Sequence, residues 1–205
     1  MSPETSALPG TVRPRGRTER VRQAVTDATR TLLLEQGYRE LSVERVAEVA
    51  GVAKSTVYRR WRDTAGLLLE LMTELSTGEI PLVDTGSVEE DLLSLARGIA
   101  HVYTETNAGP MVLALIAESV QNERVADGLR EFWHHRNDRA AESVRRAIER
   151  GDLPADTDPV EVIRMLGAPF YYRMLVTHEP LDDDLARRAA ATALAAARAG
   201  DLRKR

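Results

Sequence analysis

The chain has 205 residues, of which 43% are hydrophobic, so it is long enough to bury the cores of one or two domains. It contains no cysteine, which excludes disulfides, thiolate metal sites and cysteine nucleophiles. No apolar run approaches the ~20 residues of a membrane span. The chain begins MSPETSALPG, without the basic and apolar segments of a signal peptide. We therefore expect a soluble, cytoplasmic protein.

The net charge of −4 is distributed unevenly along the chain. Residues 1–62 hold 12 Lys and Arg against 7 Asp and Glu, whereas the remainder holds 16 against 25. Because salt screens charges over about 10 Å, an acidic chain can still present a locally basic surface to a polyanion. The N-terminal part is therefore a candidate for binding nucleic acid, the alternative being a surface that is merely uneven.

Residues 1–17 are rich in Pro, Gly, Ser and Thr and lack hydrophobic periodicity, which predicts a flexible arm. The end of this arm carries Arg13, Arg15 and Arg17, interrupted by proline and glycine, so we expect an irregular backbone there. Arginines on such an arm suit the minor groove of DNA, where narrow A·T tracts concentrate negative potential. The alternative is a solvated tail.

Apolar residues at helical spacing predict a helix over 18–36, which Gly37 ends. The next stretch, 42–61, predicts two short helices joined by a tight turn. The first of them, 42–50, buries one face, and Gly51 follows where the chain reverses, since glycine reaches positive φ without a Cβ clash. Such a pair is typical of the helix-turn-helix that enters the major groove of DNA.

The second helix of the pair, 53–61, turns Val57 and Trp61 inward and its donors and cations outward. Short side chains early in such a helix approach base edges, whereas longer cations reach phosphates. The candidates are Lys54, Ser55 and Thr56 for the bases, and Tyr58, Arg59 and Arg60 for the DNA backbone. For Tyr58 the alternative is packing in the core.

This stretch and its flanks, about residues 18–70, closely resemble the DNA-binding domain of the TetR family of transcriptional regulators. The matching residues are Val25, Ala28, Leu32, Leu33, Gly37-Tyr38, Val46-Ala47, Ala50-Gly51-Val52, Thr56-Val57-Tyr58 and Trp61. Two positions depart from the family pattern: Thr29 replaces a usual alanine, and Thr64 replaces a lysine that habitually contacts phosphate.

The resemblance implies that the Tyr58 hydroxyl touches a phosphate and that Arg60 or Arg62 replaces the missing lysine contact. Together with Ser42, at the start of the helix-turn-helix, these residues complete our set of DNA-binding candidates. Asp63 is a good N-cap for a further helix over 63–77, which in the family links two domains.

The remainder of the chain predicts helices only. Residues 78–86 contain a proline and two glycines and predict a linker. The helices that follow are expected over 87–106, 111–120, 123–150, 158–177 and 181–199. The expected fold is all-α with about nine helices. Its parts are an arm (1–17), a helix-turn-helix domain with its connecting helix (18–77), and an effector-binding and dimerisation domain (78–205).

The segment 168–175 holds three aromatic residues in a chain that is only 4% aromatic. Pro169 inside a helix removes one hydrogen bond and kinks the helix, which opens space beside Gly167. We expect a cavity for an apolar or aromatic small molecule, which the resemblance also favours; a solidly packed core is the alternative. The candidate lining residues are Met111, Leu115, Trp133, Phe170, Tyr171 and Met174.

The sequence lacks a phosphate-binding glycine loop, a Gly-x-Ser-x-Gly and a His-Glu-x-x-His motif. His134 and His135 are helix neighbours that diverge by about 100°, which disfavours a shared metal ion. The acidic run 182–184 suits the positive end of a helix dipole better than a cation cage. We therefore expect neither catalytic residues nor a cofactor nor a metal.

A homodimer is expected because two half-sites about 34 Å apart double the DNA contacts of one helix-turn-helix. The resemblance implies that the last two long helices form the interface. Small residues at Ala189, Thr192, Ala193 and Ala196 permit close approach, unless this helix simply faces solvent. We expect a repressor that a small molecule releases from a double-stranded DNA operator. The alternative is an architectural or constitutive DNA-binding protein without an effector.

Overall fold

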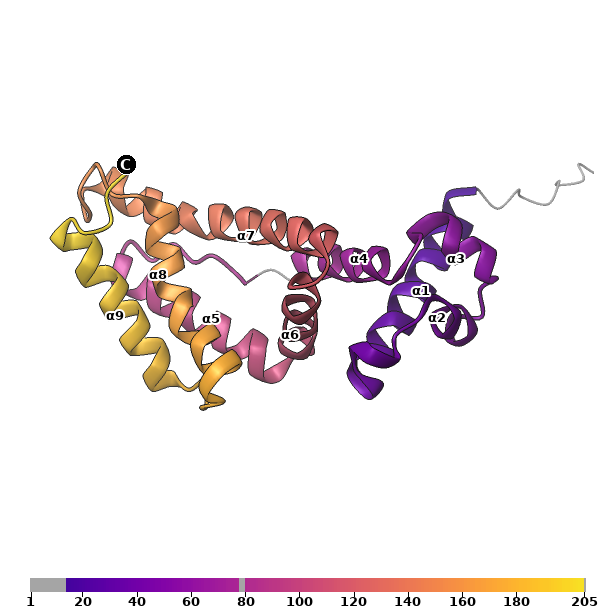
Figure 1. Cartoon of the computed structure of the whole chain (residues 1–205). Helices are drawn as coiled ribbons and strands as arrows, with labels where there is room; N and C mark the ends of the chain where they lie inside the picture. The colour runs from indigo at the N-terminus through magenta and orange to yellow at the C-terminus, as the bar shows by residue number, and fades with distance from the viewer. Residues whose placement is uncertain (1–13, 78–79, 205) are drawn as a thin grey trace, which may run out of the picture. The chain divides into compact units, whose positions relative to one another are not determined.

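The computed structural model describes residues 14–77 and 80–204, and within them the chain forms nine α-helices, a 3-10 turn and a π-helical turn. The chain divides into two compact units, Met1–Leu67 and Leu68–Arg205. The division falls inside α4 (Thr64–Thr77), which therefore belongs to both units. Each unit is built of packed helices (Figure 1), as the sequence predicts. Within the described ranges, no helix is both long and apolar enough to cross a membrane.

The first unit consists of α1 (Pro14–Gln36), the 3-10 turn η1 (Tyr38–Glu40), α2 (Val43–Ala50), α3 (Lys54–Trp61) and the start of α4. α2 packs against both α1 and α3. The buried side chains lie at the spacing that the sequence predicts: Val25, Ala28, Leu32, Leu33, Val46, Ala47, Val57 and Trp61. Burying an aliphatic side chain of this kind contributes about 1.5–3 kcal/mol.

Thr29 is fully buried in α1, and its Oγ1 donates to the carbonyl of Val25 at 2.7 Å. A buried hydroxyl is costly only when it lacks a partner. The helix itself supplies that partner, which explains why a threonine is tolerated where the family usually has an alanine.

α1 begins at Pro14 and not at position 18, so the irregular backbone predicted for residues 14–17 is wrong. Proline fixes φ near −65° and has no N–H to satisfy, so the first turn of a helix accommodates it. Arg15 and Arg17 thus lie on the first turn of α1, whereas their side chains and the remainder of the predicted arm lie outside the described residues.

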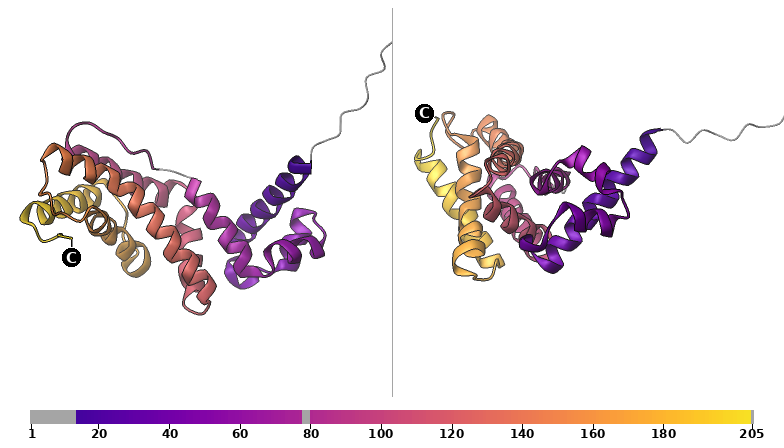
Figure 2. Two further views of the ribbon diagram at one scale, coloured as in Figure 1. Left: turned by 90° about the horizontal axis from the view of Figure 1, so that it is seen from above. Right: turned by 45° about the vertical axis from the view of Figure 1, so that its right-hand side comes forward.

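The second unit contains α5 (Val88–Glu105), α6 (Ala108–Ser119), α7 (Glu123–Arg150), α8 (Pro159–Tyr172), the π-helical turn η2 (Arg173–Thr177) and α9 (Asp183–Ala199). α8 packs against α7 and α9, and α5 packs against α9 (Figures 1 and 2). α6 starts at Ala108, three positions before the predicted start, because its glycine and proline fall in the first turn, where a missing N–H costs nothing.

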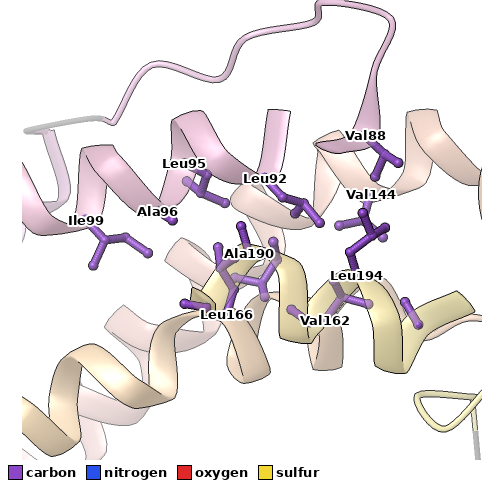
Figure 3. Close-up of a cluster of buried hydrophobic side chains, with 14 of the residues drawn as sticks. Val88, Leu92, Leu95, Ala96, Ile99, Val144, Val162, Leu166, Ala190 and Leu194 are labelled. Atoms are coloured by element: carbon purple, nitrogen blue, oxygen red, sulfur yellow. The ribbon is translucent and has the colours of Figure 1, made fainter. Parts of the chain in front are cut away.

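The core of this unit lies between α5, α7, α8 and α9 (Figure 3). Its buried side chains include Val88, Leu92, Leu95, Ala96, Ile99, Val144, Val162, Leu166, Ala190 and Leu194. Ala189 and Ala193 are only 3% and 0% exposed and belong to the same core. The prediction that these two alanines face a second subunit is therefore wrong, because they already pack within their own chain.

Helix caps fix the start of α8 and both ends of α9 where the sequence predicts them, whereas α8 ends at Tyr172 and continues to Thr177 as the π-helical turn η2. Asp158 Oδ1 accepts from the N–H groups of Val160 and Glu161 at 3.0 and 3.2 Å. Asp182 Oδ1 accepts from the N–H of Leu185 at 2.8 Å, which makes it an N-cap. α9 ends at Gly200 with a φ of 77°, a left-handed conformation that glycine adopts without strain.

Candidate DNA-binding helix and effector cavity

α2 and α3 form the predicted helix-turn-helix. Ser42 caps α2, since its Oγ accepts from the N–H of Arg45 at 3.2 Å. Gly51 ends α2 with φ 63° and ψ 30°, and Val52 then donates its N–H to the carbonyl of Ala47 at 3.0 Å. These bonds fix the reversal of the chain. Ser42 is thus engaged in capping, and its contact with DNA remains a prediction.

α3 separates an apolar face from a polar face. Val57 and Trp61 are 0% and 4% exposed and anchor the helix in the core of the first unit. The predicted DNA-binding residues lie on the rest of its surface. Exposed are Lys54, Ser55, Tyr58, Arg59, Arg60 and, just beyond the helix, Arg62, while Thr56 is half-buried. The arrangement brings donors and cations together on a short rod that suits the width of a major groove.

Tyr58 is 46% exposed, so the alternative that it packs in the core is wrong. Its hydroxyl donates to the carboxylate of Glu44 on α2. This hydrogen bond lowers the pKa of Glu44 and raises the pKa of Tyr58. The sequence did not single out Glu44, because it meets Tyr58 only through the packing of α2 against α3.

Arg60 is already engaged within the first unit. Its Nη1 donates to the carbonyl of Thr18 in α1 at 3.2 Å, and its guanidinium lies 5.0 Å from the centroid of the Trp61 ring. The stacked cation holds the end of α3 against α1. Beyond it, Asp63 Oδ1 accepts from the N–H of Gly66 at 2.9 Å, which confirms the N-cap predicted for α4.

The second unit contains a partly open cavity of about 400 Å³ between α5, α7, α8 and the connecting segment, residues 80–87. Its apolar walls are formed by Ile80, Leu82, Leu95, Ile99, Val102 and Ile163. A smaller cavity of about 300 Å³ adjoins it and shares the lining residues Ile99, Trp133, Asn137, Ile163 and Tyr171. Volumes of this size are typical of small-molecule sites.

A chain of aromatic rings crosses the cavity wall from α7 to α5. The rings of Trp133 and Tyr171 lie 5.1 Å apart at 75°, and those of Tyr171 and Tyr103 lie 5.8 Å apart at 70°. Phe132 continues the chain behind Trp133, at 5.0 Å and 77°. These edge-to-face pairs stabilise one another beyond the area that they bury. They set the shape of the cavity.

Two hydroxyls and a guanidinium add polarity to this wall. Tyr103 Oη and Tyr171 Oη lie 3.2 Å apart, within hydrogen-bonding distance. Burial raises the pKa of Tyr103, and raises that of Tyr171 well above its usual range, against a smaller lowering by the charge of Arg136. Both phenols are therefore neutral at physiological pH and able to donate.

Trp133 and Tyr171 line the larger cavity, as predicted from the sequence. Phe170 is 0% exposed and faces the core with Leu166, about 100° around α8 from Tyr171. The lining role predicted for four residues is thus corrected, since this cavity is not lined by Met111, Leu115, Phe170 or Met174. Sequence reasoning missed the connecting segment, Tyr103 and Arg136. In the described ranges, no three His, Asp or Glu side chains gather to hold a metal ion.

The connecting segment is fixed by charged and polar contacts. Asp91 in α5 is 2% exposed, and its Oδ1 accepts from both the N–H and the Oγ1 of Thr85 at 2.9 Å. Arg146 in α7 donates to the carbonyl of Val83 at 2.9 Å and pairs with Asp84 at 3.3 Å. At its other end, a Cβ on residue 98 would lie 2.4 Å from Ile80 Cγ2, so Gly98 allows Ile80 a close approach that a larger residue would force it to give up.

These features define a helix-turn-helix domain followed by a helical domain that contains a cavity with an aromatic wall. Comparison with known proteins assigns both parts. Residues 25–71 match the family model of bacterial regulatory proteins of the tetR family, and residues 82–193 match the tetracyclin repressor-like C-terminal domain.

Individual relatives agree. The HTH-type transcriptional regulator YdeS of Bacillus subtilis is 30% identical over 85% of this chain and 88% of its own length. AqdR of Rhodococcus erythropolis, also an HTH-type transcriptional regulator, is 32% identical over 78% of this chain and 75% of its own. The crystal structure of the TetR family regulator SCO0332 superposes with a TM-score of 0.68 at 33% identity, over 85% of this chain and 97% of that one. The chain belongs to the TetR family of transcriptional regulators, a family of DNA-binding proteins and not of enzymes.

Proposed function

We propose that this regulator is a homodimeric repressor that a small aromatic molecule releases from its operator. The observation that carries the proposal is the pairing of an exposed, cationic α3 with an aromatic-walled cavity in the second unit. α3 places Lys54, Ser55 and Thr56 at its N-terminal end, where short side chains reach base edges. Arg59, Arg60 and Arg62 follow as phosphate contacts, and Tyr58 joins them when its hydroxyl exchanges Glu44 for a phosphate oxygen.

The release step requires that the effector bind the DNA-competent and DNA-incompetent states with different affinity. The connecting segment supports such coupling, because it lines the cavity through Ile80 and Leu82 and follows α4 closely in the chain. An effector that displaces these two side chains changes the position favoured for the end of α4. α4 runs from the first unit into the second and is the natural transmitter.

The proposed DNA binding is tested in two steps with the full chain. Operators are selected from a random pool of DNA duplexes, and the affinity for them is measured by fluorescence anisotropy. We expect Tyr58→Ala and Arg60→Ala to weaken operator binding at least several-fold while the helical circular dichroism stays unchanged. Each lost phosphate contact also reduces the salt dependence of binding. Arg130→Ala, an exposed arginine on α7, is the matched control and retains full affinity. Unchanged affinity in both α3 variants removes them from the interface.

The proposed effector response is tested by measuring the shift in melting temperature of the chain with a panel of aromatic compounds. Each compound that binds is then tested for release of the chain from its operator. Release at a concentration that saturates the cavity supports the repressor model. A compound that raises the melting temperature without releasing DNA, or the failure of every compound to bind, favours an effector-independent DNA-binding protein. Transcription from the selected operator, with and without the chain, then distinguishes repression from activation.

A further inference from the structure

We propose that Glu44 opposes DNA binding by α3, because its carboxylate occupies the Tyr58 hydroxyl that a DNA phosphate would take. The carboxylate thereby lowers the sequence-independent part of the affinity, the part that the phosphate backbone supplies. The inference rests on the proposed contact between Tyr58 and a phosphate, and it is independent of the effector and its cavity.

The Tyr58 hydroxyl serves one acceptor at a time. It donates to the carboxylate of Glu44, which lies on α2. A phenol carries a single O–H proton, so this hydroxyl cannot donate to Glu44 and to a phosphate oxygen together. Carboxylate and phosphate oxygens are both strong anionic acceptors. A phosphate that binds Tyr58 must therefore displace Glu44.

The displaced carboxylate also repels the phosphate that replaces it. Glu44 and Tyr58 are both exposed on the surface of the first unit, so a phosphate that reaches the hydroxyl comes close to the carboxylate. Two like charges a few ångströms apart repel each other even in water. Because salt screens exposed charges over about 10 Å, the repulsion is strongest at low salt.

Lys54 connects the same carboxylate to a candidate base contact at the start of α3. The hydrogen bond from Tyr58 is the main cause that lowers the pKa of Glu44, and the charge of Lys54 lowers it further. The carboxylate is therefore ionised at neutral pH and offsets part of the charge of Lys54. Glu48, one turn further along α2, is instead paired with Arg45 at 2.8 Å. Glu44 is thus the acid of α2 that acts on the recognition helix.

Two other roles for Glu44 predict different effects of its removal. Glu44 lies in the first turn of α2, where a negative charge also stabilises the helix. A role in stability alone predicts that Glu44→Gln lowers the melting temperature and leaves the DNA affinity unchanged. A role in orienting Tyr58 for DNA predicts weaker binding. Competition with phosphate predicts tighter binding, so the sign of the change in affinity separates the three roles.

The test measures the affinity of the full chain for a fluorescent duplex of random sequence by anisotropy, at about 50 and 200 mM salt. Glu44→Gln retains the size of the side chain and one oxygen acceptor but removes the charge. We expect it to tighten binding by about threefold or more at the lower salt concentration, and by less at the higher one. Glu149→Gln, which removes an exposed acid on α7, controls for the change in net charge and retains the affinity of the unmodified chain.

The same exchange in a Tyr58→Phe background tests whether Glu44 acts through the hydroxyl. We expect a smaller gain there, because no hydroxyl remains for the carboxylate to hold. Equal gains in both backgrounds, or a Glu44→Gln variant that binds no more tightly than the unmodified chain, overturn the inference but leave DNA binding by α3 intact. Failure of the unmodified chain to bind any duplex at the lower salt concentration overturns the DNA-binding role of α3 and this inference with it.

Discussion

Arg62 has a backbone conformation that arginine rarely adopts. Its φ of 72° and ψ of −51° place it in a γ-turn, in which the N–H of Asp63 donates to the carbonyl of Trp61 at 2.8 Å. A γ-turn with positive φ is strained for any residue with a Cβ. Strain of this kind concentrates at functional sites, where a fixed direction of the side chain compensates for it. Here the side chain in question is a candidate phosphate contact directly after the recognition helix.

We predict that Arg62→Gly raises stability and lowers DNA affinity. Glycine relieves a strain of about 1–3 kcal/mol and loses about 0.5–1 kcal/mol through the entropy of the unfolded chain, so the free energy of unfolding rises by about 1 kcal/mol in urea denaturation. Operator affinity falls several-fold because one cation is lost. Arg62→Ala is the control, since it removes the cation but retains the Cβ. A glycine variant less stable than the alanine variant contradicts the strain argument.

The buried tyrosine pair predicts a dependence of stability on alkaline pH. Burial raises the pKa of Tyr103 and, more strongly, that of Tyr171. Because both folded-state values exceed the unfolded value of about 10, their contribution is fully present below that pH and is lost as the pH rises through the folded values. We expect the melting temperature to fall less steeply between about pH 9.5 and 11.5 in the double variant Tyr103→Phe, Tyr171→Phe than in the unmodified chain. Parallel curves refute this assignment.

At the scale of elements, the junction between α3 and α4 depends on Gly66. This glycine is needed for the space around it and not for a positive φ. A Cβ on residue 66 would lie 1.9 Å from the carbonyl oxygen of Trp61, which belongs to the backbone and cannot move aside. We predict that Gly66→Ala lowers the free energy of unfolding by about 1–3 kcal/mol, the usual cost of overpacking, as measured in urea. Gly16→Ala is the matched control, since a Cβ there meets open space and alanine favours helix. An unchanged Gly66→Ala variant shows that the junction can relax.

The elements that the sequence predicted well are those whose ends are fixed locally. Gly51 and Gly200 stop their helices, and Asp63 and Asp158 start theirs, because each acts on its own backbone. Pro14 and the proline of α6 misled the prediction, since a proline that breaks a helix interior also suits a first turn.

The candidate site was less predictable than the fold, because its residues meet only through packing. Helical periodicity groups Phe170 and Tyr171 in one aromatic segment, but whether each faces core or cavity depends on where α5 and α7 lie. The contact between Glu44 and Tyr58 likewise joins two helices. Helical spacing turns Arg136 inward together with Phe132 and Ala140, but that it lines a cavity depends on the packing of α5 and α8.

At the scale of the whole molecule, the proposed dimer makes a prediction about an exposed apolar surface. Met165, Tyr172, Leu175 and Val176, on α8 and η2, are 38%, 59%, 36% and 61% exposed. Clustered apolar surface of this kind marks protein interfaces. We expect Tyr172→Glu to shift the chain to monomer in analytical ultracentrifugation and to weaken operator binding at least tenfold, because one helix-turn-helix then reads one half-site.

Val120→Glu, at the end of α6 and 81% exposed, controls for the loss of an exposed hydrophobic residue and leaves both properties unchanged. A Tyr172→Glu variant that stays dimeric places the interface on another surface, and a monomeric variant with full affinity shows that α3 needs no second copy.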